Sequence, residues 1–349
     1  MGVKKSNIKC KGCGGNLVFS PSHSSLFCEN CQRTEKIDFE KQPSKKDYTE
    51  DFNEETKIQK TTNCSTCGAQ LVLNPREITK NCQYCGSSFV VDSDEIIGLK
   101  PDAIIPFSFD KTEAVKRYKK NVRKKLFLPN AFKKAPSFES LHSTYVSCFS
   151  FDVDTSSTYS GKLNCTETYF VDGKPKIKHY TRKISGSHSK DFRDCIIEAS
   201  KQTDQESFDQ IKPFQINENS TFKYDEDFIR GYEVESYDQG LISCKLYSQS
   251  YIKDIIKKEI LSKYSYSSVA YFNLTTHFSN YKYSYVLLPV YFFNIKYKEK
   301  EYLTYLNGQT GKLGDNLPKS KVKIFFAVLG VLLLLALFYF LGSYLSSLQ

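Results

Sequence analysis

The sequence has little of what an extracellular protein needs. Its first twelve residues, MGVKKSNIKCKG, contain no apolar run, so the hydrophobic segment of a secretory signal peptide is missing. There is also no tryptophan, and only one methionine, among the 349 residues. Because disulfide frameworks belong mainly to secreted chains, we expect the cysteines of this chain to stay reduced.

Motifs for catalysis are missing as well. The five histidines show neither zinc-protease spacing nor a neighbouring nucleophile. Residues 308–312, GQTGK, resemble a phosphate-binding loop, but two residues separate the glycines where four are needed, so we interpret them as a hairpin turn. Asp152 and Asp154 are typical of one solvated strand face. We expect no catalytic residue, no cofactor-binding residue and no enzymatic activity, unless a site forms only in the fold.

What the chain does have is a repeated cysteine pattern. Residues 10–31 read CKGCGGNLVFSPSHSSLFCENC and residues 64–85 read CSTCGAQLVLNPREITKNCQYC, so both follow Cys-x2-Cys-x14-Cys-x2-Cys. Four thiolates from two tight turns form a closed tetrahedral zinc site, and this spacing is typical of a zinc ribbon. Since sulfur fills all four positions, both zinc ions are predicted to be structural. The predicted ligands are Cys10, Cys13, Cys28 and Cys31 for the first zinc, and Cys64, Cys67, Cys82 and Cys85 for the second.

The other cysteines do not share this spacing. We interpret them as buried core thiols rather than nucleophiles. His23 lies inside the first ribbon, and since four cysteines already complete the shell, we expect it in a solvent-exposed loop. The isolated cysteines are Cys148, Cys165, Cys195 and Cys244.

The C-terminal region predicts a membrane anchor. Ile324 to Leu341 is a run of 18 residues without a charge, and about 20 apolar residues span the hydrocarbon core of a bilayer. We predict a transmembrane helix over residues 322–344. Lys319, Lys321 and Lys323 precede the uncharged run, so the positive-inside rule predicts a single-pass protein whose bulk is cytoplasmic.

Charge is unevenly distributed along the chain. Residues 1–98 hold 13 basic and 13 acidic side chains, whereas the rest carries the whole net charge of +10. A nucleic-acid-binding domain needs a basic footprint, so we favour protein contacts for the ribbons and keep nucleic-acid binding as the alternative. Much of the excess lies in residues 110–128, where a basic amphipathic helix is predicted. Its basic face either contacts anionic lipid or is simply solvated.

The pattern along the chain predicts an α+β fold with a largely antiparallel sheet. We expect helices near residues 110–127, 191–200 and 251–264, and strands at 145–153, 157–171, 176–184, 270–277, 285–297 and 302–306. The predicted units are a zinc ribbon at 1–36, a flexible charged linker at 37–61, a second ribbon at 62–98, an α+β body at 99–318 and the membrane helix at 322–344.

Beyond the two cysteine repeats, three segments carry a resemblance to a known family: IIPFSFDKTEAVKRYKKNVRKKLFLPNAFKK (104–134), YVSCFSFDVD (145–154) and LLPVYFFNIKYKEKEYLTYLNGQTGK (287–312). With the terminal helix, the layout resembles bacterial TFIIB-type zinc-ribbon-containing membrane proteins, some of which carry a primosomal-helicase label. Family members commonly have a tryptophan and a proline in the strand that matches 145–154, and a tryptophan where this chain has Tyr291.

The resemblance implies a membrane-anchored cytoplasmic protein that acts with membrane-stress or SPFH-type scaffolding proteins. The helicase label implies nothing for this chain, which has no phosphate loop. The expected function is therefore a zinc-ribbon adaptor that mediates protein–protein interaction, and the alternative is a membrane-tethered nucleic-acid binder.

Overall fold

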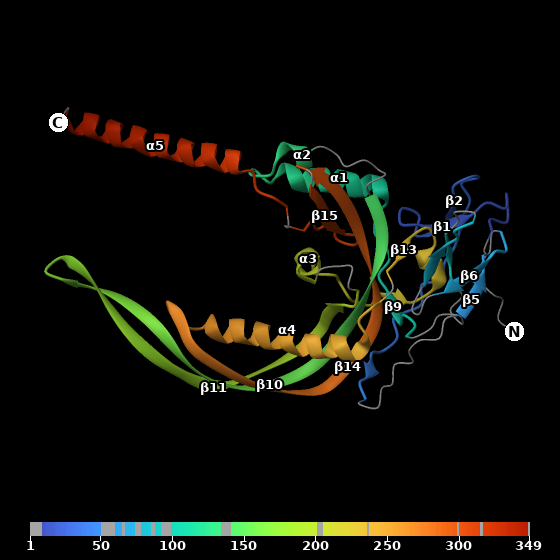
Figure 1. The fold of residues 1–349 in the computed structure, drawn as a ribbon, viewed down its shortest axis with the longest axis horizontal. Helices are drawn as coiled ribbons and strands as arrows, with labels where there is room; N and C mark the ends of the chain where they lie inside the picture. The colour runs from blue at the N-terminus through green and yellow to red at the C-terminus, as the bar shows by residue number, and fades with distance from the viewer. Residues whose placement is uncertain are drawn as a thin grey trace.

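The computed structural model describes residues 9–49, 60–64, 67–73, 78–84, 88–91, 99–133, 141–200, 205–235, 237–298, 300–314 and 317–347. A long curved sheet forms the middle of the molecule, two small cysteine-bearing ribbons lie at one end, and a C-terminal helix projects away from them (Figure 1). The predicted α+β class with mostly antiparallel pairing is confirmed.

The N-terminal ribbons consist of short antiparallel strands. In the first ribbon β1 pairs with β2, and β2 with β3; in the second, β5 pairs with β6 and β7 with β8. Their bounds are β1 Leu17–Ser20, β2 Ser25–Cys28, β3 Thr34–Glu35, β5 Lys60–Asn63, β6 Gln70–Leu73, β7 Thr79–Asn81 and β8 Ser88–Val90.

The central sheet has eight strands among the described residues, in the order β11-β10-β14-β9-β12, with β13 on β10 and both β15 and β4 on β14. Its strands are β4 Lys46–Asp47, β9 Ala103–Ile104, β10 Leu141–Val171, β11 Lys174–Glu198, β12 Phe222–Lys223, β13 Glu233–Val234, β14 Ser268–Tyr297 and β15 Lys300–Asn307. The helices are α1 Lys111–Arg123, α2 Asn130–Lys133, α3 Gln205–Ile211, the 3-10 helix η2 Glu226–Ile229, α4 Leu241–Leu261 and α5 Lys321–Ser347.

Three of these strands are much longer than the sequence pattern predicts. The strands expected at 145–153 and 157–171 form the single strand β10, and those at 270–277 and 285–297 form β14. Near the body, β10 packs on both faces: Tyr145 and Phe149 contact the core on the side of α1 and α4, whereas Val146 and Cys148 contact the core on the side of α3. Further out, β10, β11 and β14 continue away from the body as an arm (Figure 1).

The predicted helix at 191–200 is wrong, because this segment is the end of β11. A β-bulge explains the error. Val153 pairs with Phe192 and Phe151 with Cys195, so two residues of β11 stand opposite one residue of β10. The bulge interrupts the alternation of buried side chains, and the resulting spacing resembles that of a helix face.

The helices predicted near residues 110–127 and 251–264 are confirmed as α1 and α4, although their bounds differ. The backbone N–H of Glu113 donates to Asp110 Oδ1 at 2.8 Å and caps α1. Leu126, inside the predicted helical range, lies beyond the end of the helix and is exposed. Helix α4 begins ten residues before the predicted start at Tyr251 and lies along one face of the arm (Figure 1).

The first ribbon is packed against the body. The backbone N–H of Phe19 donates to the carbonyl of Arg230 at 2.9 Å, and the ring of Phe19 meets that of Phe228 edge-on at 5.5 Å. Close approach requires Gly231, which has φ of 84° and where a Cβ would lie 2.9 Å from Val18 Cβ. In the second ribbon Thr79 Oγ1 accepts from the backbone N–H of Val234 at 3.2 Å.

The predicted flexible linker at 37–61 also differs from the structure over its described parts, residues 37–49 and residues 60–61, which begin β5. Strand β4 pairs with β14, and Phe39 packs edge-on against Phe228 at 5.2 Å. Lys45 Nζ donates to Asp152 Oδ1 at 2.5 Å and to Asp194 Oδ1 at 2.7 Å. The low apolar content of this stretch hid its attachment, because ion pairs and backbone pairing hold it. The rest of the predicted linker up to residue 59 lies outside the described residues.

Helix α5 is a candidate membrane span. Its apolar part, Lys321–Gly342, is 22 residues long and is not buried by the rest of the chain. Its first turn is attached to the body, since Lys323 Nζ donates to the carbonyl of Leu128 and to Asn130 Oδ1, each at 2.7 Å. The point at which the chain would enter a bilayer is therefore next to the turn between α1 and α2.

Candidate metal centres

The first cysteine cluster is built from two matching turns. In one, the N–H of Gly14 donates to the carbonyl of Cys10 at 2.8 Å; in the other, the N–H of Gln32 donates to the carbonyl of Cys28 at 2.8 Å. Gly14 and Gln32 both have a positive φ, 70° and 61°. Each turn exposes the sulfur of its first and last cysteine toward the other turn, because the hairpin β1–β2 places the two turns side by side.

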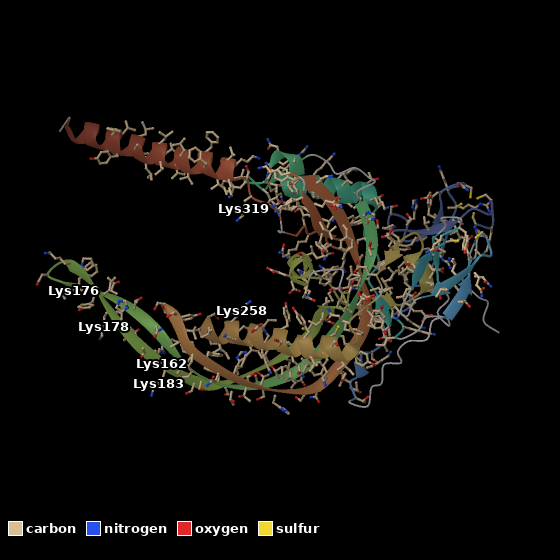
Figure 2. All side chains as sticks on the ribbon, viewed as in Figure 1. Lys162, Lys176, Lys178, Lys183, Lys258 and Lys319 are labelled. Atoms are coloured by element: carbon tan, nitrogen blue, oxygen red, sulfur yellow. The ribbon has the colours of Figure 1, made fainter. Side chains whose placement is uncertain are left out.

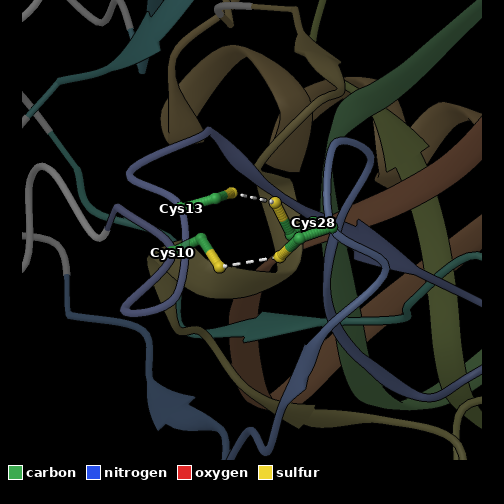
Figure 3. A group of neighbouring side chains, drawn as sticks. Cys10, Cys13 and Cys28 are labelled. Atoms are coloured by element: carbon green, nitrogen blue, oxygen red, sulfur yellow. Dashed lines mark hydrogen bonds between the residues drawn. The ribbon is translucent and has the colours of Figure 1, made fainter.

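The sulfur atoms of this cluster fit a tetrahedral metal. The four Sγ atoms lie within 4.8 Å of one another, with 3.4 Å between Cys10 and Cys31 and 3.5 Å between Cys13 and Cys28 (Figure 3). Four Zn–S bonds of about 2.3 Å give sulfur–sulfur edges of about 3.8 Å. A disulfide needs about 2.05 Å, so these are free thiols that could bind a metal ion.

Hydrogen bonds to the sulfurs also influence the charge of the cluster. The backbone N–H groups of Cys13 and Gly12 lower the pKa of Cys10 to about 6. The backbone N–H of Arg33 favours the Cys31 thiolate too, but the neighbouring sulfurs outweigh it and raise the pKa of Cys31 to about 12. The backbone around Cys10 therefore favours its thiolate, which is the form of cysteine that binds a metal ion.

The second cluster contains a turn like the one at Cys10. The N–H of Gly68, with φ of 74°, donates to the carbonyl of Cys64 at 2.8 Å. Cys64, Cys67 and Cys82 have their sulfurs within 4.8 Å of one another, and Cys67 lies 3.7 Å from Cys82. The fourth predicted ligand, Cys85, lies outside the described residues. The structure thus shows one four-cysteine cluster and one three-cysteine cluster that can bind metal ions.

Residues near the clusters occupy the expected places. His23 lies in the loop between β1 and β2, where it stacks on Phe27 at 5.0 Å and its Nδ1 hydrogen-bonds Ser20 Oγ at 2.9 Å. The need for a small residue at Gly15 was not predicted from the sequence. A Cβ at this position would lie 3.3 Å from the sulfurs of Cys13 and Cys28. Only the folded turn reveals that this position must stay small.

The isolated cysteines are all buried, as predicted. Burial raises the pKa of Cys148 well above its ordinary value and raises the pKa of Cys195 to about 11. Both thiols are therefore protonated at neutral pH. The carboxylate pair is engaged as well, since Asp154 accepts from Arg193 at 2.7 Å and from Asn280 at 2.8 Å.

Helix α1 lines an open basic hollow of about 450 Å³ together with the turn at 310–311. Arg117 belongs to the packing rather than to the solvated face, because its guanidinium stacks on Phe109 at 4.2 Å and donates to the carbonyl of Thr310 at 3.3 Å. Lys116, Lys120 and Lys124 complete the basic lining. Residues 307–312 form the predicted hairpin turn, in which Gly311 N–H donates to Asn307 O at 2.9 Å.

Comparison with known proteins finds a distant relative that matches along nearly the whole chain. The chain is 28% identical over 322 residues to the uncharacterized protein YdjG of Bacillus subtilis (strain 168), covering 91% of this chain and 92% of the relative. No family model matches the chain. No solved structure matches it.

Proposed function

We propose that this chain is a membrane-anchored cytoplasmic adaptor, a non-enzymatic protein whose zinc ribbons form a rigid surface for protein contacts. The observation that carries the proposal is the arrangement of two metal-binding clusters at one end and an exposed apolar helix that projects away from them (Figure 1). Two structural zinc ions would hold the ribbons, and α5 would cross the membrane once. The layout agrees with the TFIIB-type zinc-ribbon-containing family that the sequence resembles.

The packing of the ribbons supports a rigid presentation. Phe19 and Thr79 attach the two ribbons to neighbouring parts of the body, at Arg230 and Val234. The sequence predicts a flexible linker between the ribbons. These contacts instead favour ribbons that are fixed on the body and extend its surface. A rigid surface binds a partner with less loss of conformational entropy than a mobile one.

The partner class follows from charge. The ribbon segment has no net formal charge, and each zinc held by four thiolates adds about two negative charges. Such a surface does not attract a phosphate backbone, so a protein partner is favoured over the alternative, a nucleic acid. By the family resemblance, the proposed partners are membrane-stress or SPFH-type scaffolding proteins.

Site-specific photo-cross-linking in intact membranes tests the proposal. Tyr84, which is 76% exposed on the second ribbon, would be replaced by a photoreactive phenylalanine in the full chain. We expect a defined cross-linked protein, and we expect Cys67→Ser, which breaks the second cluster, to abolish it. Cys244→Ser, which removes a buried thiol of helix α4 that is not a predicted ligand, is the matched control and should leave the cross-link intact.

The nucleic-acid alternative has its own readout. The purified full chain in detergent would be mixed with single-stranded and double-stranded DNA and RNA at two salt concentrations. The proposal expects no binding that depends on the ribbons. Tight binding that falls steeply with salt and is lost in Cys67→Ser would overturn it.

A further inference from the structure

The far end of the arm has no packing partner in the described chain. The strands β10 and β11 meet at the turn Asp172–Gly173, where both residues have a positive φ. We call residues 162–183 the tip. Phe170 is 71% exposed and Ile177 is 64% exposed. An exposed apolar cluster at the end of a long hairpin indicates a contact surface.

The tip has two different faces. Residues paired across the hairpin share a face, and Phe170 pairs with Pro175 and Thr168 with Ile177. These four side chains make one face of the outermost hairpin free of charge. The opposite face carries Lys174, Lys176 and Lys178, paired with Val171, Tyr169 and Glu167.

Lysines lie on the same face as the apolar side chains, nearer to the body. Lys162 pairs directly with Lys183 on the same face as Phe170 and Ile177, although like charges opposite each other destabilise a sheet. Among the described residues, no carboxylate lies within ion-pair distance of either lysine. Figure 2 shows both lysines on the outer side of the arm, and Lys176 and Lys178 near its end. The tip has six basic and two acidic side chains, so its partner must be anionic.

We propose that the tip is a membrane-contact element that inserts Phe170, Pro175 and Ile177 at the acyl–headgroup boundary of an anionic bilayer. The flanking lysines then bind phospholipid headgroups. An apolar cluster bordered by lysines and tyrosines is the composition that membrane interfaces select. Anionic lipid also relieves the repulsion between Lys162 and Lys183.

Other anionic or apolar partners fit the tip less well. A second copy of the chain would bring like charges together, and lysines along an unpaired strand edge oppose strand addition. A single-stranded nucleic acid requires a groove lined with aromatic rings, whereas this face is the end of a two-stranded ribbon and includes aliphatic Ile177 and Pro175. A bilayer is also the partner that α5 would bring into reach, since α5 and the arm project from the same side of the body (Figure 1).

The proposal sets a condition on α5. The lysines of the tip cannot enter hydrocarbon, so α5 cannot cross a bilayer while it runs alongside the arm as in Figure 1. Residues 317–320 join α5 to the body and form neither helix nor strand. We place the change of direction there. It releases the hydrogen bonds of Ser320 and Lys323 to residues 127–130, and the first turn of α5 and the tip then lie at one membrane surface.

The absence of tryptophan from the chain allows a direct test. Phe170→Trp in the full-length protein is reconstituted into nanodiscs, each of which contains a single bilayer, and its fluorescence is measured with brominated lipids. In discs containing phosphatidylglycerol we expect a blue-shifted emission and a loss of about half of the intensity, as for a side chain at the interface. The matched control, Tyr84→Trp on the second ribbon, should show neither change.

The charge requirement is tested in the same background. Lys162→Glu with Lys183→Glu should abolish the quenching, whereas Lys253→Glu with Lys257→Glu, the same charge change on the exposed side of α4, should not. Equal quenching in discs of phosphatidylcholine alone would contradict the role of the lysines. An unquenched Phe170→Trp in anionic discs, or a spectral shift caused only by added oligonucleotides, would overturn the proposal. Copurification with the discs reports the anchor separately, so failure of α5 and failure of the tip give different results.

Discussion

The ribbons and the sheet of the body are stabilised by different physical means. The first ribbon has a few short strands, of two to four residues each, and its cysteine sulfurs lie together where a metal would hold them. The body instead buries large side chains such as Phe149, Tyr145 and Tyr291 completely. We infer that the ribbons depend on zinc for their structure, whereas the body depends on apolar burial and is indifferent to metal.

Loss of one ligand should give the largest effect and should be confined to one ribbon. We predict that Cys28→Ser releases about one zinc per chain and unfolds the first ribbon, because a structural zinc contributes about 10 kcal/mol to the folding of so small a unit. Metal analysis and the exchange of backbone amides in β1 and β2 measure the effect. Cys244→Ser is the control, and two zinc ions retained in Cys28→Ser would contradict the assignment.

A core substitution should have the converse effect. Phe149→Ala removes a fully buried ring and is expected to lower the free energy of unfolding of the body by about 3–5 kcal/mol, with both zinc ions retained. Denaturant unfolding followed by circular dichroism gives the first quantity, and metal analysis the second. The exposed Phe170→Ala should change stability by less than about 0.5 kcal/mol. Loss of zinc from Phe149→Ala in the folded state would show that the two regions are not independent.

Loss of the contact between the first ribbon and the body should cost less stability than loss of a zinc ligand or of a core ring. Phe19→Ala removes the ring that meets Phe228. We predict a cost of about 3 kcal/mol, at the low end for a buried phenylalanine, seen as faster exchange of the Phe19 amide that donates to Arg230. The zinc content should stay at two. Unchanged exchange would mean that the ribbon is held mainly by other contacts.

The smallest effect is expected on the arm and depends on pH. Lys190, and then His188, lower the pKa of Glu259 below its ordinary value of 4.5. A depressed carboxyl pKa contributes stability above the unfolded-state pKa and loses it as pH falls through the folded-state pKa. Glu259→Gln should therefore be less stable than the unchanged chain at pH 7, and the difference should close below about pH 4.5. A difference that does not shrink as the pH falls would exclude the ion pair as its cause.

The parts of the structure that sequence could predict are local ones. The cysteine turns need only neighbouring residues, such as Gly14 and Gly68, and the Asp110 cap and the apolar run of α5 are likewise visible within a few turns of chain. The errors arise where distant segments meet. The bulge at Asp194 gave a strand the spacing of a helix, and Lys45 attaches an apparent linker through carboxylates more than a hundred residues away. The length of the arm also depends on pairing between β10 and β14, which periodicity within one strand does not reveal.

The central claim is that each ribbon is closed around one zinc ion by cysteine sulfur. The most direct test is elemental analysis of the full-length protein purified under reducing conditions, combined with X-ray absorption at the zinc edge. The account predicts two zinc ions per chain, each with four sulfur neighbours at about 2.3 Å. A metal-free protein, or cysteine sulfurs joined to one another in the cell, would contradict it.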